Sequence, residues 1–430
     1  MHYFTSINKN YIPKARVLAK SVKQYCKDAK FSLVFSDSLP EGFVIEKEPF
    51  DEVITLDQLG IPVENLNLWI FMHSVVELCT AVKGQALYNF LRSGSEKVVY
   101  LDPDIAVFSD LNELENLLDQ NDIVLTPHQT YPEENDRSII IDNEICSMKH
   151  GVYNLGFLAV KSSPNGLDFA KWWRDRLVEF CYDDIPSGLF TDQRWGDLVP
   201  CLFEGVNILR DPSYNVATWN INYREVKQTG DWDFTVNDIP LKFYHFSGFD
   251  SGAQECMLKK YGRGNVALWN LRNWYLKRMD EEGQKEFGGM HSCYDFYSNG
   301  QNISKAEREM LKNRRDVQEH FLDSNPFLIN ADLLKCYYDS YQTKIKRKKG
   351  TDLSLQDYDA EAMLQAIYNS RSWKLTAWLR KLRAALKRKK STDLSSQDYD
   401  AEAKLQAIYN SRSWKYTTWL RKLRVALKGA

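Results

Sequence analysis

Two aspartates, Asp102 and Asp104, stand on either side of a proline directly after the strand-forming run 97–101. Two carboxylates at the end of a buried strand are costly unless a ligand binds them, because ionised groups resist burial. Carboxylate oxygens are ligands that Mg²⁺ and Mn²⁺ prefer, and such an ion also binds phosphate oxygens. The pair therefore predicts a divalent metal that holds a diphosphate. The plainer interpretation is a solvated turn, because Asp-Pro-Asp also favours turns.

Further stretches carry polar residues that suit such a site. His245 follows the strand-forming run "LKFYHF" and precedes a glycine turn, where it suits a third metal ligand. Lys83 lies on a predicted helix that leads into the aspartate strand, within reach of a diphosphate. Taken singly, a core histidine and an exposed helix lysine are the commoner outcomes. The other stretches are "YNLG", with Asn154 and Gly156, and "TDQRW", with Asp192 and Gln193.

The elements that must position these residues alternate along roughly the first 250 residues. Helical patterns occupy 11–26, 81–94 and 168–183, and in the last of these Trp172 and Trp173 are expected to be packing residues. Such alternation is typical of α/β folds with a mostly parallel sheet, in which ligands bind beyond the carboxyl ends of strands. Strands are predicted at 2–7, 31–36, 52–56, 97–101, 122–127, 156–161 and 241–246.

The predicted secondary structure changes after residue 250. Helices and aromatic turns follow, including helical patterns at 267–279 and 305–315, and they predict a helical subdomain over 251–345. The remaining residues, 346–430, contain a near-identical duplication, with repeats at about 348–388 and 389–430. Two copies are too few to bury the continuous core of a solenoid. We therefore expect a catalytic domain at 1–250, the helical subdomain and a duplicated tail.

The tail carries basic amphipathic helical patterns that include tryptophans. This composition is typical of helices that lie in a membrane interface, and anionic lipids attract the basic face. The alternative is a helical hairpin that packs on its own domain or on another subunit, as in a homo-oligomer. No nucleic-acid partner is expected, since no recognised nucleic-acid module accompanies the basic residues. The apolar face of the second repeat is formed by Tyr416, Leu420, Leu423 and Leu427.

The overall composition is that of a soluble globular protein. The chain has 430 residues, of which 43% are hydrophobic and 27% charged, with a net charge of -2 that points to no particular partner. No apolar stretch approaches the ~20 residues that span a bilayer, and no signal peptide is predicted at the N-terminus. The eight cysteines are scattered without a CxxC pair, which argues against a zinc site and a disulfide framework. We expect a cytoplasmic location with reduced thiols.

In their order along the chain, the motifs of residues 1–330 resemble those of the GT-A nucleotide-sugar glycosyltransferases. They look most like the retaining, family-eight-type enzymes of bacterial lipopolysaccharide synthesis, and the tail resembles those of O-antigen and capsule glycosyltransferases. The resemblance implies a GT-A fold, a Rossmann-like, mostly parallel mixed sheet flanked by helices. It also implies Mn²⁺ or Mg²⁺ on Asp102, Asp104 and His245. The residues that it implies for the nucleotide sugar, most simply a UDP-sugar, are Thr5, Ser6, Ile7, Asn10, Tyr11, Lys83, Asp102, Asn154, Gly156 and Gly248.

The chain departs from the family pattern in three places. "TSINKN" lacks the aspartates of the family's N-terminal turn, Arg194 replaces the last aspartate of the "DQD" motif, and the "KPW" segment is missing. If the product retains configuration, Gln193 lines the reacting face and no strong base is needed. If the product is inverted, a carboxylate base is required, with Asp192 and Asp250 as the candidates. The candidates for stacking on an acceptor sugar, each with a core role as the alternative, are Trp195, Trp219 and Tyr223.

Together these features predict a metal-dependent hexosyltransferase. It would act on a lipid-linked surface polysaccharide or lipopolysaccharide acceptor, while attached peripherally to the inner face of the cell membrane. One alternative is a nucleotidyltransferase, which would be expected to carry a glycine-rich basic loop, but "TSINKNYIP" has no glycine. The other is a non-catalytic adaptor with a decayed fold, against which the intact Asp102, Asp104 and His245 argue.

Overall fold

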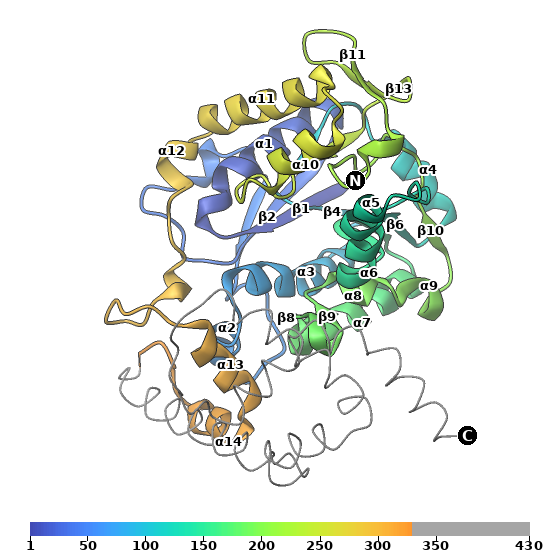
Figure 1. Ribbon diagram of the computed structural model, residues 1–430. Coiled ribbons are helices and arrows are strands. Elements are labelled where there is room, and N and C mark those ends of the chain that lie inside the picture. The colour runs from blue at the N-terminus through green and yellow to red at the C-terminus, as the bar shows by residue number, and fades with distance from the viewer. Residues whose placement is uncertain (329–430) are drawn as a thin grey trace, which may run out of the picture. The chain divides into compact units, whose positions relative to one another are not determined.

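The computed structural model describes residues 1–328, which are built around a central seven-stranded sheet (Figure 1). The strand order is β10-β6-β7-β4-β1-β2-β3. Neighbouring strands run parallel, except that β7 is antiparallel to both β4 and β6. The predicted class, a mostly parallel mixed sheet, is therefore confirmed. The strands are β1 (His2–Ile7), β2 (Lys30–Phe35), β3 (Glu52–Thr55), β4 (Lys97–Leu101), β6 (Ile123–Pro127), β7 (Tyr153–Lys161) and β10 (Val206–Ile208).

Helices cover both faces of this sheet, as the α/β alternation predicted (Figure 1). On one face, Leu18 of α1 and Leu118 of α4 share a core with Tyr3 of β1. On the other face, Phe90 of α3 packs against Phe4 of β1, with ring centroids 5.2 Å apart. The helices are α1 (Ile12–Tyr25), α3 (Val75–Arg92), α4 (Asn112–Gln120) and α7 (Pro164–Phe180).

Helix α3, which carries Lys83, is fixed by its local sequence and by a close neighbour. A capping box of Ser74 and Glu77 begins the helix, so it starts earlier than the run 81–94 predicted. At Gly84 an added Cβ would lie 2.7 Å from the Cα of Arg174, so only glycine allows α7 to pack so closely here. Trp173 of α7 is fully buried, which confirms its predicted packing role.

The predicted strand at 241–246 forms outside the main sheet. Strand β14 (Phe243–His245) pairs antiparallel with β5 (Ile105–Val107), and His245 lies opposite Ile105 in the register. The backbone N–H of Phe246 also donates to the carbonyl of Asp104 at 2.8 Å. The pairing of two segments far apart in the sequence therefore places His245 beside the aspartate turn.

Helices that follow residue 250 share a core with the preceding strands. Tyr275 of α11 (Val266–Glu281) and Leu258 of α10 (Ala253–Tyr261) pack with Phe108 and Val236. The domain boundaries predicted near residues 250 and 345 stay predictions, and the duplicated tail lies outside the described residues. Further elements are α2 (Leu66–Phe71), α5 (Arg137–Ile139), α6 (Cys146–His150), β8 (Asp183–Asp184), β9 (Leu189–Phe190), α8 (Gln193–Gly196), α9 (Val199–Leu202), β11 (Val226–Gln228), β12 (Phe234–Val236), β13 (Ile239–Pro240), α12 (Gln284–Phe287), α13 (Lys305–Asn313) and α14 (Arg315–Gln318).

Candidate active site

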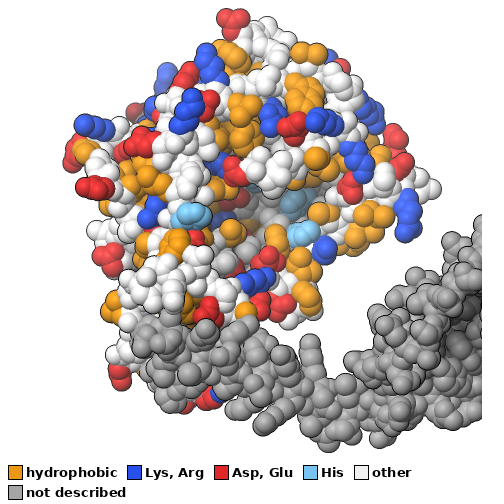
Figure 2. Space-filling view, turned by 60° about the vertical axis from the view of Figure 1, so that its left-hand side comes forward, with side chains coloured by type: hydrophobic (Ala, Val, Ile, Leu, Met, Phe, Trp, Pro, Cys, Tyr) orange, Lys and Arg blue, Asp and Glu red, His pale blue; other side chains and the backbone are white. Residues whose placement is uncertain are grey.

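A cleft of about 970 Å³ opens beyond the carboxyl ends of β1 and β4. The space-filling view shows this hollow, with histidine side chains at its margin (Figure 2). Its walls are formed by residues of β1 and α3, of the segment 142–150 and of the loop 183–193. The segment 284–295, which the sequence gave no reason to place here, also lines it. The cleft lies where an open α/β sheet binds its ligands.

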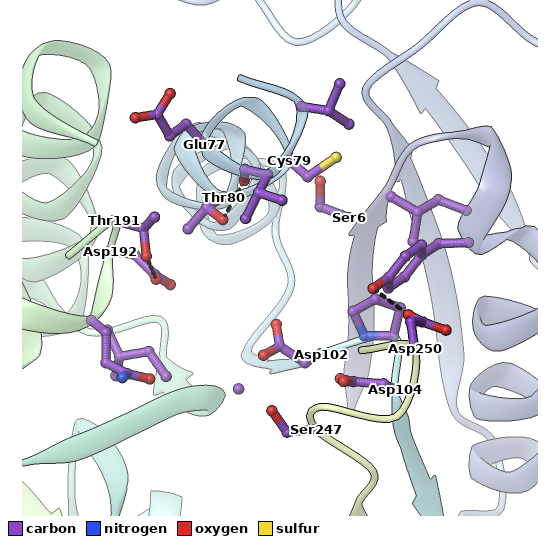
Figure 3. Close-up of a pocket in the computed structure, with 18 of the residues that line it drawn as sticks. Ser6, Glu77, Cys79, Thr80, Asp102, Asp104, Thr191, Asp192, Ser247 and Asp250 are labelled. Carbon is purple, nitrogen blue, oxygen red and sulfur yellow. Dashed lines mark hydrogen bonds between the residues drawn. The ribbon is translucent and has the colours of Figure 1, made fainter. Parts of the chain in front are cut away.

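Asp102, Asp104 and His245 converge at the floor of this cleft. Their ligand atoms all lie within 4.8 Å of one another. The Nε2 atom of His245 is 3.1 Å from an oxygen of Asp104 and 3.8 Å from an oxygen of Asp102. In the close-up, the two aspartates point into open space, with Ser247 beside them (Figure 3). The donor set of two carboxylates and one imidazole suits Mn²⁺ or Mg²⁺.

Gly156 provides the room that such an ion requires. A Cβ at this position would lie 2.5 Å from His245 Cε1 and 2.8 Å from an oxygen of Asp102. The carbonyl of Gly156 accepts the backbone N–H of Asp102 at 2.8 Å, so the chain cannot move away from the aspartate without breaking that bond. The three candidate ligands therefore surround a cradle that any other residue would fill, and they fit a metal ion.

Lys83 is a buried member of the same cluster. Its ammonium lies 3.1 Å from Asp102 and 3.0 Å from Asp192, and its side chain is 6% exposed. Tyr100 donates its hydroxyl to Asp102 at 2.6 Å, and its ring lies 4.2 Å from the Lys83 ammonium. Lys83 is therefore buried, and it is not the exposed helix lysine that is the commoner outcome. Lys83 holds together carboxylates from two elements far apart in the sequence.

The charges of the cluster stabilise one another. Burial disfavours the ammonium of Lys83, but Asp102 and Asp192 outweigh this effect and raise its pKa. Burial likewise opposes ionisation of Asp104, yet His245 and Lys14 lower its pKa to about 2. Burial opposes protonation of His245, but the two carboxylates raise its pKa. Without a metal, the imidazole thus pairs with the aspartates, and a bound cation would take the place of its proton.

The residues predicted for the sugar lie on one wall of the cleft. Asn154 donates to Gln193 Oε1 at 3.3 Å, and Gln193 in turn donates to the carbonyl of His150 at 3.1 Å. Asp192 lines the same wall, opposite Asp102 and Asp104 (Figure 3). Burial raises the pKa of Asp192 against the opposing attraction of Lys83.

The N-terminal turn contributes part of the predicted nucleotide site. Ser6, Ile7 and Tyr11 line the cleft, as does Asn10. Thr5 is fully buried within β1 and does not line it, because successive strand residues point to opposite faces. Gly248 also lies outside the lining. It has φ +73, in the left-handed region, where it turns the chain from β14 towards α10.

Asp250, the second candidate base, is held by two residues of the N-terminal segment. It pairs with the ammonium of Lys14 and accepts the hydroxyl of Tyr11 at 2.9 Å. Lys14 is 2% exposed and lies with its ammonium 3.8 Å from the centre of the Tyr11 ring. Sequence reasoning missed Lys14, because its helix position resembles that of any other lysine.

Among the aromatic candidates for an acceptor sugar, Trp219 lines the cleft, while Trp195 and Tyr223 lie outside its lining. The Trp219 ring is edge-on to His245, with centroids 5.3 Å apart. Trp195 packs against Trp172 at 6.1 Å, which is the core role given as the alternative. Trp219 is therefore the aromatic side chain of the three that a bound sugar can reach.

The chain is similar to two uncharacterized proteins of Bacillus subtilis strain 168. It is 26% identical to YfnF over an alignment of 256 residues, and the match covers 57% of this chain and 81% of YfnF. It is 24% identical to YfnD over an alignment of 255 residues, and the match covers 58% of this chain and 78% of YfnD. No family model matches the chain.

Solved structures similar to the chain include glycosyltransferases. GlyE of Streptococcus pneumoniae TIGR4 matches with a TM-score of 0.33 and 19% identity, over 50% of this chain and 46% of GlyE. The chain thus spans less than half the length of GlyE. The galactosyltransferase LgtC, solved with donor and acceptor sugar analogs, matches with a TM-score of 0.36 and 18% identity, over 65% of this chain and 96% of LgtC. These likenesses concern the fold. Within residues 1–328, no helix combines the length and apolar character needed to cross a bilayer.

Proposed function

We propose that this protein is a metal-dependent glycosyltransferase that takes a hexose from a nucleotide-diphosphate donor. The observation that carries this proposal is the convergence of Asp102, Asp104 and His245 in a large cleft, beside the buried ammonium of Lys83. Two hard oxygen ligands and an imidazole next to a fixed cation suit a diphosphate better than a neutral substrate. Mn²⁺ or Mg²⁺ and a UDP-sugar are the ligands that we propose.

Each group of residues in the cleft has a chemical role in this reaction. A divalent ion held by Asp102, Asp104 and His245 would supply positive charge to the departing diphosphate. Lys83, already aligned by Asp102 and Asp192, adds a second positive charge on the same side. Asn154 and Gln193 present amide groups to the hydroxyls of the donor sugar.

We favour transfer with retention of configuration. An inverting enzyme needs a carboxylate that accepts the acceptor proton, and both candidates stand against a lysine ammonium. Asp192 pairs with Lys83, and Asp250 pairs with Lys14. Each carboxylate therefore already engages an ammonium instead of lying free to meet the hydroxyl of an acceptor. In a retaining reaction, the leaving phosphate accepts that proton and Gln193 lines the reacting face.

For the acceptor we propose a lipid-linked surface polysaccharide or lipopolysaccharide, reached from the cytoplasmic face of the membrane. Support comes from the resemblance of the sequence motifs and from the basic amphipathic repeats of the tail. We also propose that a homo-oligomer would form through the same repeats. Trp219, at the floor of the cleft, is suited to stack on an acceptor sugar.

A panel of nucleotide sugars with Mn²⁺ tests the proposal. We expect one donor class to be hydrolysed slowly or transferred, and NMR of the product anomer to show retained configuration. Asp104→Ala should abolish turnover while the fold is kept, and Asp231→Ala, at an exposed bend, serves as the matched control. Normal turnover in Asp104→Ala would refute the metal assignment, and an inverted product would refute retention.

A further inference from the structure

Asn215 is a fully buried residue that none of the sequence motifs includes. It precedes the short bridge between Val216 and Tyr244, and its φ of +50 lies in the left-handed region. Asparagine and glycine adopt this conformation more readily than other residues. Its backbone carbonyl accepts the side-chain amide of Asn220 at 3.0 Å. The backbone of Asn215 is therefore held in one place, and its buried side chain lies outside the cleft lining.

This side chain touches a candidate metal ligand and a candidate sugar-binding residue at once. Its Nδ2 atom donates to Asn154 Oδ1 at 3.1 Å and to Thr126 Oγ1 at 3.0 Å. Its Oδ1 atom lies 3.3 Å from His245 Nδ1. All three partners are buried. An amide in this setting has no freedom to turn over unless its neighbours turn over as well.

The orientation of each amide follows from a backbone group at one end of the network. The carbonyl of His150 only accepts, so Gln193 must face it with Nε2 and face Asn154 with Oε1. Asn154 must then donate to Gln193, which leaves its Oδ1 to accept from Asn215. Asn215 consequently turns its own oxygen towards His245. The hydrogen-bond network, rather than visible hydrogens, assigns these positions.

The chemical consequence falls on the imidazole of His245. The Asn215 oxygen accepts a hydrogen from Nδ1, so a cation that replaces the proton between Nε2 and the aspartates meets the lone pair of Nε2. Nε2 is the atom that faces Asp104 and Asp102, at 3.1 and 3.8 Å. The opposite tautomer would place an N–H at the metal position and a lone pair against the Asn215 oxygen.

We propose that Asn215 is a positioning residue that fixes the metal-binding tautomer of His245. The relay from His150 through Gln193, Asn154 and Asn215 determines which nitrogen of the imidazole faces the aspartates. Partners of this kind orient metal-bound histidines, and their loss typically costs ~10–100-fold in metal affinity. The importance of this role for catalysis rests on the proposed function, whereas the tautomer itself does not.

Two substitutions separate the hydrogen bond to His245 from the bulk of the side chain. Asn215→Asp keeps an oxygen acceptor for His245 and tolerates the left-handed conformation, but it loses the donor for Asn154. Asn215→Gly keeps the backbone conformation and removes the side chain. Asn237→Gly is the matched control, because Asn237 has φ +51 and is exposed, away from the cleft lining.

The first measurement is Mn²⁺ binding by electron paramagnetic resonance of the free ion, with thermal unfolding to verify the fold. We expect Asn215→Gly to bind Mn²⁺ ~10–100-fold more weakly, and Asn215→Asp to bind within about threefold of the wild type or more tightly. Asn237→Gly should match the wild type. Equal Mn²⁺ affinity in Asn215→Gly and the wild type, or equal losses in both Asn215 variants, would overturn the proposal.

The second measurement reads the tautomer in the protein loaded with Mg²⁺ alone. Long-range proton–nitrogen NMR of labelled histidine, at saturating Mg²⁺, should show hydrogen at Nδ1 of His245 in the wild type and in Asn215→Asp. The His245→Gln spectrum assigns the signal. Hydrogen at Nε2 in the wild type would overturn the proposal. Because no nucleotide sugar is added, this result stands even if the protein neither binds nor transfers a nucleotide sugar, which is the outcome that refutes the proposed function.

Discussion

Substitution of Gly156 by alanine places one methyl group inside the proposed metal site. The added Cβ would lie 2.5 Å from His245 Cε1, whereas carbon atoms in contact are ordinarily ~3.5–4.0 Å apart. The imidazole must therefore retreat by about 1 Å, while metal–ligand distances tolerate only ~0.2 Å. An oxygen of Asp102, 2.8 Å from the same Cβ, must yield as well.

Two of the three proposed ligands are thus displaced by a change that adds no charge. Loss of a residue that only orients a metal ligand costs ~10–100-fold in metal affinity, so we expect a loss of at least about 100-fold when the ligands themselves are displaced. Gly156 has an ordinary negative-φ backbone, so alanine brings no left-handed strain. Turnover should fall in step with metal affinity.

The assay is a Mn²⁺ titration of the wild type and Gly156→Ala, with circular dichroism to verify the fold. Gly289→Ala is the control, because a Cβ there meets no atom within 4 Å. The control should bind Mn²⁺ as the wild type does. Wild-type Mn²⁺ affinity in a folded Gly156→Ala protein would show that the ion binds elsewhere and would refute the reasoning.

Three further predictions concern stability and localisation. Lys83→Met leaves the carboxylates of Asp102 and Asp192 without their cation, so the free energy of unfolding should fall by about 3 kcal/mol in denaturant titrations, against no change in the surface variant Lys277→Met. Burial lowers the pKa of His2 to about 4, below its unfolded value of 6.5. The unfolded chain therefore binds the extra proton, and the melting temperature should fall as the pH drops from 6.5 to 4, less so in His2→Gln; a flat profile would contradict this. Deletion of residues 346–430 should spare transfer to soluble acceptors and release the protein from anionic vesicles, and sedimentation of the truncated protein with them would argue against the membrane role.

Local sequence predicted six of the seven strands of the main sheet, but not β10, and it predicted helices α1, α3 and α7, but not α4. The run 2–7 forms β1, and all six of its residues are buried, as is typical of a parallel strand covered on both faces. The run 97–101 forms β4 and ends directly before Asp102. Where a predicted strand lies outside the main sheet, long-range pairing is the cause. Strand β14 leaves the main sheet because its partner, β5, follows the aspartate turn.

The candidate site was predictable where a residue type and a strand end coincide, or where a motif resembles those of a known family, as at Lys83. The structure brings Asp102, Asp104 and His245 together, and their role as metal ligands stays a prediction. Lys14 and Asn215 gave no signal, since a helix lysine and a loop asparagine are common and only tertiary contacts give them a place in the cluster. The segment 284–295 was missed for the same reason, because it reaches the cleft through the packing of α11 and α12.

The central claim is that a divalent ion on Asp102, Asp104 and His245 holds a nucleoside diphosphate. Calorimetric titration of UDP into the full-length protein, with and without Mn²⁺, tests it most directly. The account predicts that UDP binds to the wild type only when Mn²⁺ is present, and that Asp104→Ala binds UDP under neither condition. Equal UDP binding with and without Mn²⁺, or undiminished Mn²⁺-dependent binding by Asp104→Ala, would contradict it.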